Sequence, residues 1–270
     1  MLRIAVLGAT GRMGMNVMRV VASSDDAAVS GALVEPGNDL IGADVGEVAG
    51  LAPIGITVVD DPRQALREAD VAIDFTLPDA AIGNLDACVN QGCGIVMGTT
   101  GLDDAQQQAL RQAGQSIGVL YGRNMSVGVN VFTELARWAA RLLGPDWEVE
   151  ITEAHHRFKV DAPSGTALQI GEAIAAERDQ NLDDVACYER RGSTGGRPPE
   201  AIGFTSVRAG SLVGEHTVML VSDTELLRLE HRALHRATFA QGALRAARWL
   251  VQQPAGFYGM ADVLELGGLT

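Results

Sequence analysis

The sequence predicts an α/β domain with a parallel sheet, followed by a smaller α+β domain. From the N-terminus to about residue 126, short apolar runs alternate with helical patterns, which is typical of a parallel sheet covered on both faces. Beyond residue 127 the pattern changes, because three strand-like runs follow one another without intervening helices. A glycine-rich turn also joins the first apolar run to the first helical pattern.

The individual elements follow from these patterns. Strands are predicted in the first part at residues 2–7, 28–33, 57–59, 71–75, 94–97 and 117–121. Helices are predicted between them at residues 13–23, 62–68, 79–90 and 103–113. The second part is predicted to contain a helix at 127–143, strands at 147–154, 201–207, 215–221 and 225–231, and helices at 164–177 and 238–251. Its sheet is expected to be mainly antiparallel or mixed, residues 179–200 to form a loop, and the last residues a short apolar tail.

Composition narrows the classes of function. The chain has 270 residues, of which 47% are hydrophobic, and a net charge of −13, so binding to a nucleic-acid backbone is not expected. Three cysteines without paired spacing predict reduced thiols. No histidine lies near Cys88 and Cys93 in sequence, so no metal site is expected. The first apolar run is too short for a signal peptide or a membrane span. The cysteine pattern predicts a cytoplasmic setting.

The turn after the first strand has the features of a dinucleotide-binding site. It contains Gly8, Gly11 and Gly14, which let the backbone approach a pyrophosphate at the start of a helix. Glu35 follows the second strand, where a carboxylate can bind ribose hydroxyls. The segments 98–101 and 124–126 follow two further strands and are placed to line the same cleft. For the glycine-rich turn the alternative is a purely structural turn, and for Glu35 it is a solvated loop carboxylate. The segments 98–101 and 124–126 could each be an ordinary turn.

The residues between 153 and 167 have the features of a substrate site. His155, His156, Arg157 and Lys159 form a cationic cluster in an otherwise acidic chain, which favours an anionic substrate. Histidine and lysine can also donate protons. Ser164 or Thr166 then caps a helix whose first backbone N–H groups can bind a carboxylate. The alternative is a surface turn with an ordinary helix cap. A zinc site is not expected, because adjacent histidines do not share one face.

Several motifs together resemble those of the dihydrodipicolinate reductases. They are GATGRMG at residues 8–14, DFT at 74–76, GTTG at 98–101, NMSVGVN at 124–130, EAHHRFKVDAPSGTA at 153–167 and VRAGSLVGEH at 207–216. The resemblance covers essentially the whole chain. It implies NADH- or NADPH-dependent reduction of the cyclic dicarboxylate 4-hydroxy-tetrahydrodipicolinate in the diaminopimelate and lysine pathway.

The resemblance also implies an organisation and a set of site residues. A Rossmann-type dinucleotide-binding domain would comprise residues 1–126 and 237–270, and residues 127–236 would bind substrate and form a homotetramer. His155 and Lys159 would be the catalytic pair, and the carboxylate would be bound by His156, Gly165 and Thr166, with Ser164 as the capping residue. The implied cofactor contacts are Gly8, Ala9, Thr10, Gly11, Arg12, Met13, Glu35, Gly98, Thr99, Thr100, Gly122, Arg123, Asn124 and Met125.

The sequence departs from the family pattern in the cofactor region. Pro36 follows Glu35 where many relatives have a basic residue, which disfavours tight binding of the NADP phosphate. Arg123 and Met125 also stand where other residues are frequent. The alternative functions are those of another two-domain NAD(P)-dependent dehydrogenase and of a non-enzymatic nucleotide sensor. A semialdehyde dehydrogenase needs a nucleophilic cysteine, which the catalytic motif lacks. A sensor would leave the cationic cluster unexplained.

Overall fold

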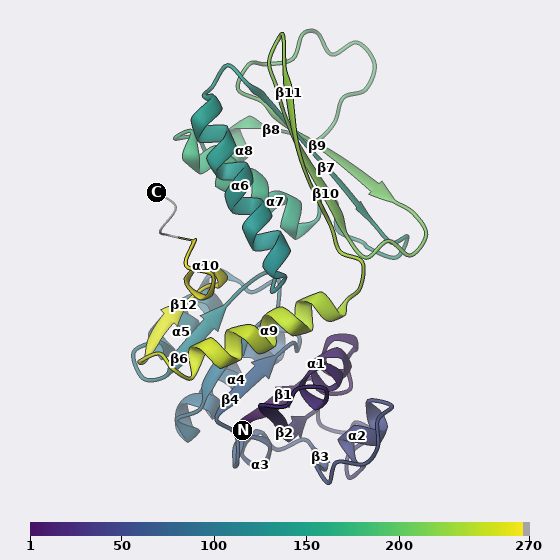
Figure 1. The fold of residues 1–270 in the computed structure, drawn as a ribbon, viewed down its shortest axis with the longest axis vertical. Coiled ribbons are helices and arrows are strands. Elements are labelled where there is room, and N and C mark those ends of the chain that lie inside the picture. Colours follow the sequence, from purple (N-terminus) through teal and green to yellow (C-terminus); the bar gives the residue numbers. More distant parts are fainter. Residues whose placement is uncertain (267–270) are drawn as a thin grey trace. The chain divides into compact units, whose positions relative to one another are not determined.

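The chain folds into two compact units. The computed structural model describes residues 1–266. The first unit comprises Met1–Val127 and the described residues from Arg236 onward, and the second comprises Gly128–His235 (Figure 1). The last four residues of the predicted first domain, 267–270, lie outside the described residues.

The first unit is built on a parallel sheet of seven strands in the order β12-β6-β5-β4-β1-β2-β3. Its strands are β1 (Leu2–Leu7), β2 (Ala27–Leu33), β3 (Val58–Val59), β4 (Val71–Asp74), β5 (Gly94–Met97), β6 (Gly118–Tyr121) and β12 (Gly256–Tyr258). All six pairings are parallel, so the carboxyl ends of these strands lie at one edge. The α/β class predicted for this part is confirmed.

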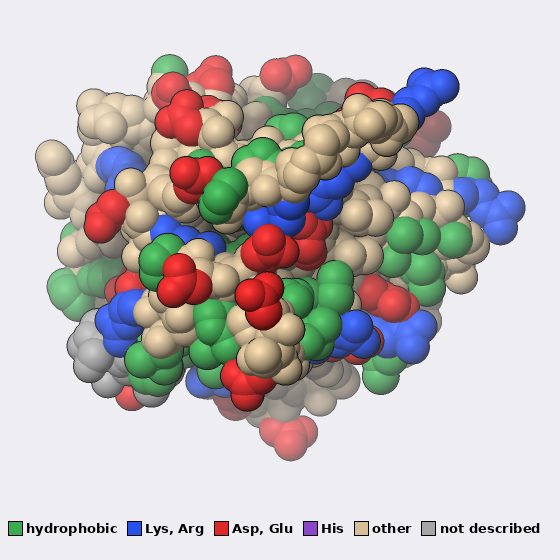
Figure 2. Space-filling model, turned by 90° about the horizontal axis from the view of Figure 1, so that it is seen from above, with side chains coloured by type: hydrophobic (Ala, Val, Ile, Leu, Met, Phe, Trp, Pro, Cys, Tyr) green, Lys and Arg blue, Asp and Glu red, His purple; other side chains and the backbone are tan. Residues whose placement is uncertain are grey.

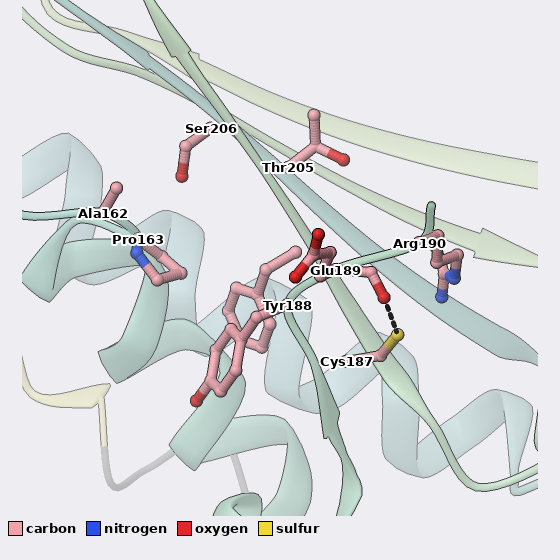
Figure 3. A pocket seen from close by; sticks show the side chains of 9 residues that line it. Ala162, Pro163, Cys187, Tyr188, Glu189, Arg190, Thr205 and Ser206 are labelled. Atoms are coloured by element: carbon pink, nitrogen blue, oxygen red, sulfur yellow. Dashed lines mark hydrogen bonds between the residues drawn. The ribbon is translucent and has the colours of Figure 1, made fainter. Parts of the chain in front are cut away.

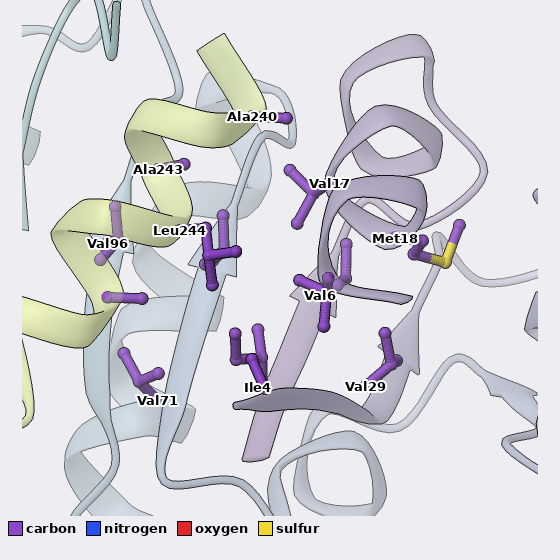
Figure 4. Packing of buried hydrophobic residues seen from close by; sticks show 14 of the residues in the cluster. Ile4, Val6, Val17, Met18, Val29, Val71, Val96, Ala240, Ala243 and Leu244 are labelled. Atoms are coloured by element: carbon purple, nitrogen blue, oxygen red, sulfur yellow. The ribbon is translucent and has the colours of Figure 1, made fainter. Parts of the chain in front are cut away.

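Helices cover both faces of this sheet (Figure 1). They are α1 (Arg12–Ala22), α3 (Pro62–Leu66), α4 (Pro78–Gln91), α5 (Asp104–Ala113) and α9 (Ala237–Leu250). On one face, α1 and α9 pack against Ile4 and Val6 of β1, as Figure 4 shows. On the other, α3, α4 and α5 pack against Ala5 and Leu7 of the same strand. Each fully buried Leu or Ile contributes about 1.5–3 kcal/mol to these cores.

The second unit is an α+β unit with a mixed sheet in the order β11-β10-β7-β9-β8. Its elements are α6 (Val127–Leu143), β7 (Glu148–His155), α7 (Gly165–Glu177), α8 (Leu182–Val185), β8 (Ala186–Cys187), β9 (Ile202–Arg208), β10 (Glu215–Val221) and β11 (Leu226–Arg232). Strand β10 is antiparallel to β7 and β11, whereas β9 is parallel to β7 and β8. The sequence predicted a mainly antiparallel or mixed sheet, and a mixed sheet is observed.

One face of this second sheet forms a core. Alternate residues of β7, including Val149 and Ile151, pack against apolar side chains of α6 and α7. Strand register places Val207 and Leu226 on the opposite face, where both are exposed. Figure 2 shows a face of the molecule on which acidic and basic side chains are interspersed.

Three regions contain elements that the sequence patterns did not predict. Helix α2 (Val45–Val48) lies in the loop after β2. Elements α8 and β8 lie in the predicted loop at 179–200. The predicted C-terminal tail contains β12 and α10 (Met260–Val263). All five are only two to four residues long, too short for a periodic pattern to develop.

Candidate functional site

The glycine-rich turn after β1 brings the backbone close to the sheet edge. Gly8 has a φ of +80°, a left-handed conformation that glycine adopts without strain. A Cβ at Gly14 would lie 2.2 Å from the carbonyl oxygen of Gly8, so only glycine fits in the first turn of α1. Helix α1 begins at N-cap Gly11, which supplies no side-chain cap. This close-packed turn fits the pyrophosphate of a dinucleotide, which needs backbone N–H groups and no intervening side chain.

Glu35 lies beside this turn. The amide Nδ2 of Asn38 donates to Oε1 of Glu35 at 2.8 Å and to Oγ1 of Thr10 at 3.5 Å, which links the carboxylate to the glycine-rich turn. Backbone hydrogen bonding and the Asn38 amide lower the pKa of Glu35. The carboxylate is therefore ionised at neutral pH and can accept hydrogen bonds from hydroxyl groups.

The two other predicted cofactor segments follow β5 and β6. Gly98, Thr99 and Thr100 follow β5, and Gly122, Arg123, Asn124 and Met125 follow β6. Because β6, β5, β4, β1 and β2 are neighbours in a parallel sheet, all the predicted cofactor residues lie along one edge. The side chains of Ala9, Thr99 and Met125 are buried, whereas Arg12 and Thr100 are exposed.

The segment after β5 is anchored by Asp74, a fully buried carboxyl at the end of β4. It accepts hydrogen bonds from Oγ1 of Thr99 at 3.0 Å, from Nδ2 of Asn84 at 2.8 Å, and from both N and Oγ1 of Thr76 at 2.7 Å. Burial raises the pKa of Asp74, and these hydrogen bonds oppose that effect. Asp74 belongs to the DFT motif, but the sequence did not indicate this anchoring role.

The predicted catalytic residues His155 and Lys159 lie at and just beyond the end of β7 in the second unit. The imidazole Nδ1 of His155 lies 2.6 Å from Oε2 of Glu153, which is 1% exposed. The ammonium of Lys159 lies 2.8 Å from the carboxylate of Asp161 and is partly exposed. His156 and Phe158 lie with their ring centroids 6.4 Å apart.

The predicted carboxylate socket is the first turn of α7. Ser164 is the N-cap, and its Oγ accepts from the backbone N–H of Ala167 at 3.1 Å. Gly165 and Thr166 are the first residues of this helix. Since the leading backbone N–H groups of a helix have no partner within the helix, this turn can bind an anion.

A buried polar network that the sequence did not predict lies beneath these residues. Arg208 donates to both carboxylate oxygens of Glu153, at 2.8 and 2.7 Å. The imidazole Nε2 of His216 lies 3.1 Å from Oγ of Ser164. Burial, reinforced by the neighbouring His155, lowers the pKa of His216 to about 3. His216 is therefore neutral at physiological pH and adds no further positive charge to the network.

A cavity of about 450 Å³ adjoins the start of α7 in the second unit. Ala162 and Pro163 line it together with Tyr188, Arg190 and Ser206, as Figure 3 shows. The predicted catalytic residues do not line this cavity. Among the described residues, there is no cluster of three or more side chains that could bind a metal ion, and no helix suited to spanning a membrane.

Comparison with known families identifies the chain. The family model described as "Dihydrodipicolinate reductase, N-terminus" matches residues 2–125, and the model described as "Dihydrodipicolinate reductase, C-terminus" matches residues 128–264. The chain belongs to the dihydrodipicolinate reductase family. The resemblance inferred from the motifs is therefore confirmed.

Individual relatives are similar to this chain over nearly their whole length. A 4-hydroxy-tetrahydrodipicolinate reductase of Pseudomonas fluorescens (strain SBW25) is 49% identical over 267 residues, covering 98% of this chain and 100% of the relative. One of Hahella chejuensis is 47% identical over 266 residues, with coverage of 98% and 100%. Dipicolinate-bound dihydrodipicolinate reductase from Paenisporosarcina sp. TG-14 shares the fold, with a TM-score of 0.74 at 23% identity over 97% and 98% of the two chains.

Proposed function

We propose that this chain reduces 4-hydroxy-tetrahydrodipicolinate to tetrahydrodipicolinate in the diaminopimelate and lysine pathway. The observation that carries the proposal is the arrangement at the end of β7, where His155 and Lys159 stand close in sequence to the first turn of α7. This combination of proton-donating side chains and an anion socket suits a small cyclic dicarboxylate. Full-length similarity to reductases of that name supports the same reaction.

The first unit is proposed to bind NADH or NADPH, which supplies the hydride. The glycine-rich turn would hold the pyrophosphate, and Glu35 would accept hydrogen bonds from the adenosine ribose. The remaining proposed contacts are Ala9, Thr10, Arg12, Met13, Gly98, Thr99, Thr100, Gly122, Arg123, Asn124 and Met125. For Thr99 and Met125 we propose contact through the backbone, because their side chains are buried.

The second unit is proposed to bind the substrate. His156, Ser164, Gly165 and Thr166 would hold one carboxylate at the start of α7, where backbone N–H groups attract negative charge without adding a titratable group. The reaction would release the 4-hydroxyl as water, and hydride transfer to the resulting conjugated ring leaves an electron-rich centre that must gain a proton. Lys159 is proposed as its donor, once the ammonium leaves Asp161, which holds it at 2.8 Å. A substrate carboxylate can replace Asp161 as its partner.

The second unit is also proposed to assemble the chain into a homotetramer in the cytoplasm. The sheet face opposite α6 and α7 carries exposed Val207 and Leu226, and covering such apolar side chains favours self-association. Size-exclusion chromatography with light scattering would test this assembly.

One assay tests the reaction itself. NADH consumption is followed after addition of freshly prepared 4-hydroxy-tetrahydrodipicolinate, with product identified by mass spectrometry. We expect turnover that depends on both ligands. Binding of NADH without turnover would instead favour a nucleotide sensor, and turnover only with an unrelated carbonyl compound would favour another dehydrogenase.

A further inference from the structure

We infer that Glu153 is a positioning residue that fixes the ring of His155 and the first residue of the α7 socket through a single buried carboxylate. The effect of Glu153 on turnover rests on the proposed function. The effect of Glu153 on the imidazole of His155 and on the α7 socket does not. Glu153 lies two residues before His155 on β7, so both side chains project from the same face of the strand.

The contacts of Glu153 account for both of its carboxylate oxygens. Oε2 lies 2.6 Å from Nδ1 of His155, and Oε1 accepts from the backbone N–H of Ser164 at 3.2 Å. Arg208 contacts both oxygens in a bidentate pair. Since a carboxylate only accepts hydrogen bonds, Nδ1 of His155 must carry the proton in this pair. The carboxylate therefore joins the proposed catalytic ring to the N-cap of the proposed socket.

This role requires an ionised carboxylate in a buried position. Burial raises the pKa of Glu153, but hydrogen bonds from His155, Arg208 and Ser206 outweigh burial and lower it to about 2. The Arg208 guanidinium supplies the compensating charge, and it also donates to the carbonyl oxygen of Asp161 at 2.6 Å. The same ion pair thus holds the segment that contains Lys159 and its partner Asp161.

Placing the proton on Nδ1 determines what the other imidazole nitrogen can do. With Nδ1–H donating to Glu153, Nε2 of neutral His155 is an acceptor. This nitrogen lies beside Gly214, where an added Cβ would be only 3.0 Å away. The absence of a side chain at Gly214 therefore leaves room at Nε2. The carboxylate sets the tautomer of His155, and glycine at position 214 avoids a close contact with Nε2.

The test compares Glu153→Gln with the matched control Glu150→Gln. Glu150 lies on the same strand and pairs with Arg190 and Arg197, but its side chain is on the opposite face from His155. Long-range nitrogen–proton NMR spectra of protein with ring-labelled histidine report the tautomer directly, with the signal of His155 assigned from a His155→Gln sample. We expect the Nδ1–H tautomer in the wild type and in Glu150→Gln, and gain of the Nε2–H tautomer in Glu153→Gln.

Two further measurements separate positioning from general stability. Pyridine-2,6-dicarboxylate should bind Glu153→Gln at least about tenfold more weakly, because Ser164 loses its anchor, while NADH affinity stays within about twofold of wild type in both variants. The kcat should fall by roughly 10²–10⁴-fold in Glu153→Gln with NADH affinity unchanged. Glu153→Asp, which restores the charge on a shorter side chain, should recover part of both losses.

The outcomes distinguish this inference from the proposed function. An Nε2–H tautomer of neutral His155 in the wild type would overturn the inference without any variant. Equal losses in Glu150→Gln and Glu153→Gln would overturn it as well, because they would reflect the strand rather than the site. If the wild type did not turn over the substrate, the proposed function would fail, whereas the tautomer and dicarboxylate binding would still decide the role of Glu153.

Discussion

The buried imidazole of His216 makes the stability of the second unit sensitive to mild acid. Burial lowers its pKa from 6.5 to about 3, and the side chain is 3% exposed. In the unfolded chain the same imidazole binds a proton near pH 6.5. Because the unfolded state then holds more protons than the folded state, the free energy of unfolding falls as pH decreases from about 6.5 to about 3.

The size of this effect follows from the two pKa values. Each pKa unit corresponds to about 1.4 kcal/mol, so the whole interval from about 6.5 to about 3 corresponds to about 5 kcal/mol. Between pH 7 and pH 5, the unfolded imidazole becomes almost fully protonated while the folded one stays neutral, which costs about 2 kcal/mol. Glu153 affects the free energy of unfolding in a different pH range. Because its pKa is lowered from 4.5 to about 2, its protonation removes stability only below about pH 4.5.

Urea unfolding at pH 7 and pH 5 would measure the effect at one protein concentration. We expect the wild type to lose about 2 kcal/mol more than His216→Gln between these pH values, because glutamine does not titrate. Taking the difference between wild type and His216→Gln removes the contribution of other titrating groups to the pH dependence. One of these groups is His231, whose pKa is also lowered by burial. Ser164→Ala is the control, since it removes the partner of His216 at 3.1 Å but keeps the imidazole. Equal pH dependence in wild type and His216→Gln would refute the reasoning.

Three further predictions concern the proposed reaction. NADH should serve at least as well as NADPH, because ionised Glu35 repels a 2′-phosphate and Pro36 adds no charge. The kcat/KM values for both cofactors test this prediction, and a preference for NADPH of about tenfold or more would contradict it. Lys159→Ala should lower kcat by roughly 10²–10⁴-fold with little change in NADH affinity, and a near wild-type kcat would exclude Lys159 as proton donor. Pyridine-2,6-dicarboxylate should compete with substrate and bind more tightly with NADH present, because hydride transfer requires the two ligands to meet within about 3–3.5 Å. Calorimetry should then show NADH tightened by the same factor, and independent binding would refute the coupling.

Elements with a clear run or repeat of apolar residues were predictable from the sequence. Helix α6 spans Val127–Leu143 as predicted, and β1, β5 and β10 also have their predicted bounds. These elements carry continuous or alternating apolar residues that end at glycine, proline or polar positions. The parallel pairing of β9 with β7 agrees with the predicted helix at 164–177 between them, because a crossover that contains a helix joins parallel strands. The polar, glycine-rich stretch over 188–201 has no helical pattern, so the sequence left the sheet as mainly antiparallel or mixed.

The candidate site was predictable where its residues are close in sequence. His155, Lys159 and Ser164 lie within ten positions, so their chemistry could be recognised together. The structure places them at the end of β7 and the start of α7, which agrees with the predicted elements. Their catalytic and binding roles are predictions that the Lys159→Ala and Glu153→Gln variants test.

The polar network beneath the site depends on strand register, which no local pattern reveals. His216 of β10 stands opposite Glu153 of β7, and Arg208 of β9 stands beside His155. In sequence these are charged or polar residues at the ends of strands, where a solvated position is the usual expectation. A one-residue shift of β10 would turn His216 to the other face, and a one-residue shift of β9 would turn Arg208 away, which would leave buried Glu153 without its guanidinium partner. A buried carboxylate without compensation is strongly destabilising, so the network that positions His155 also selects the register in which the site can form.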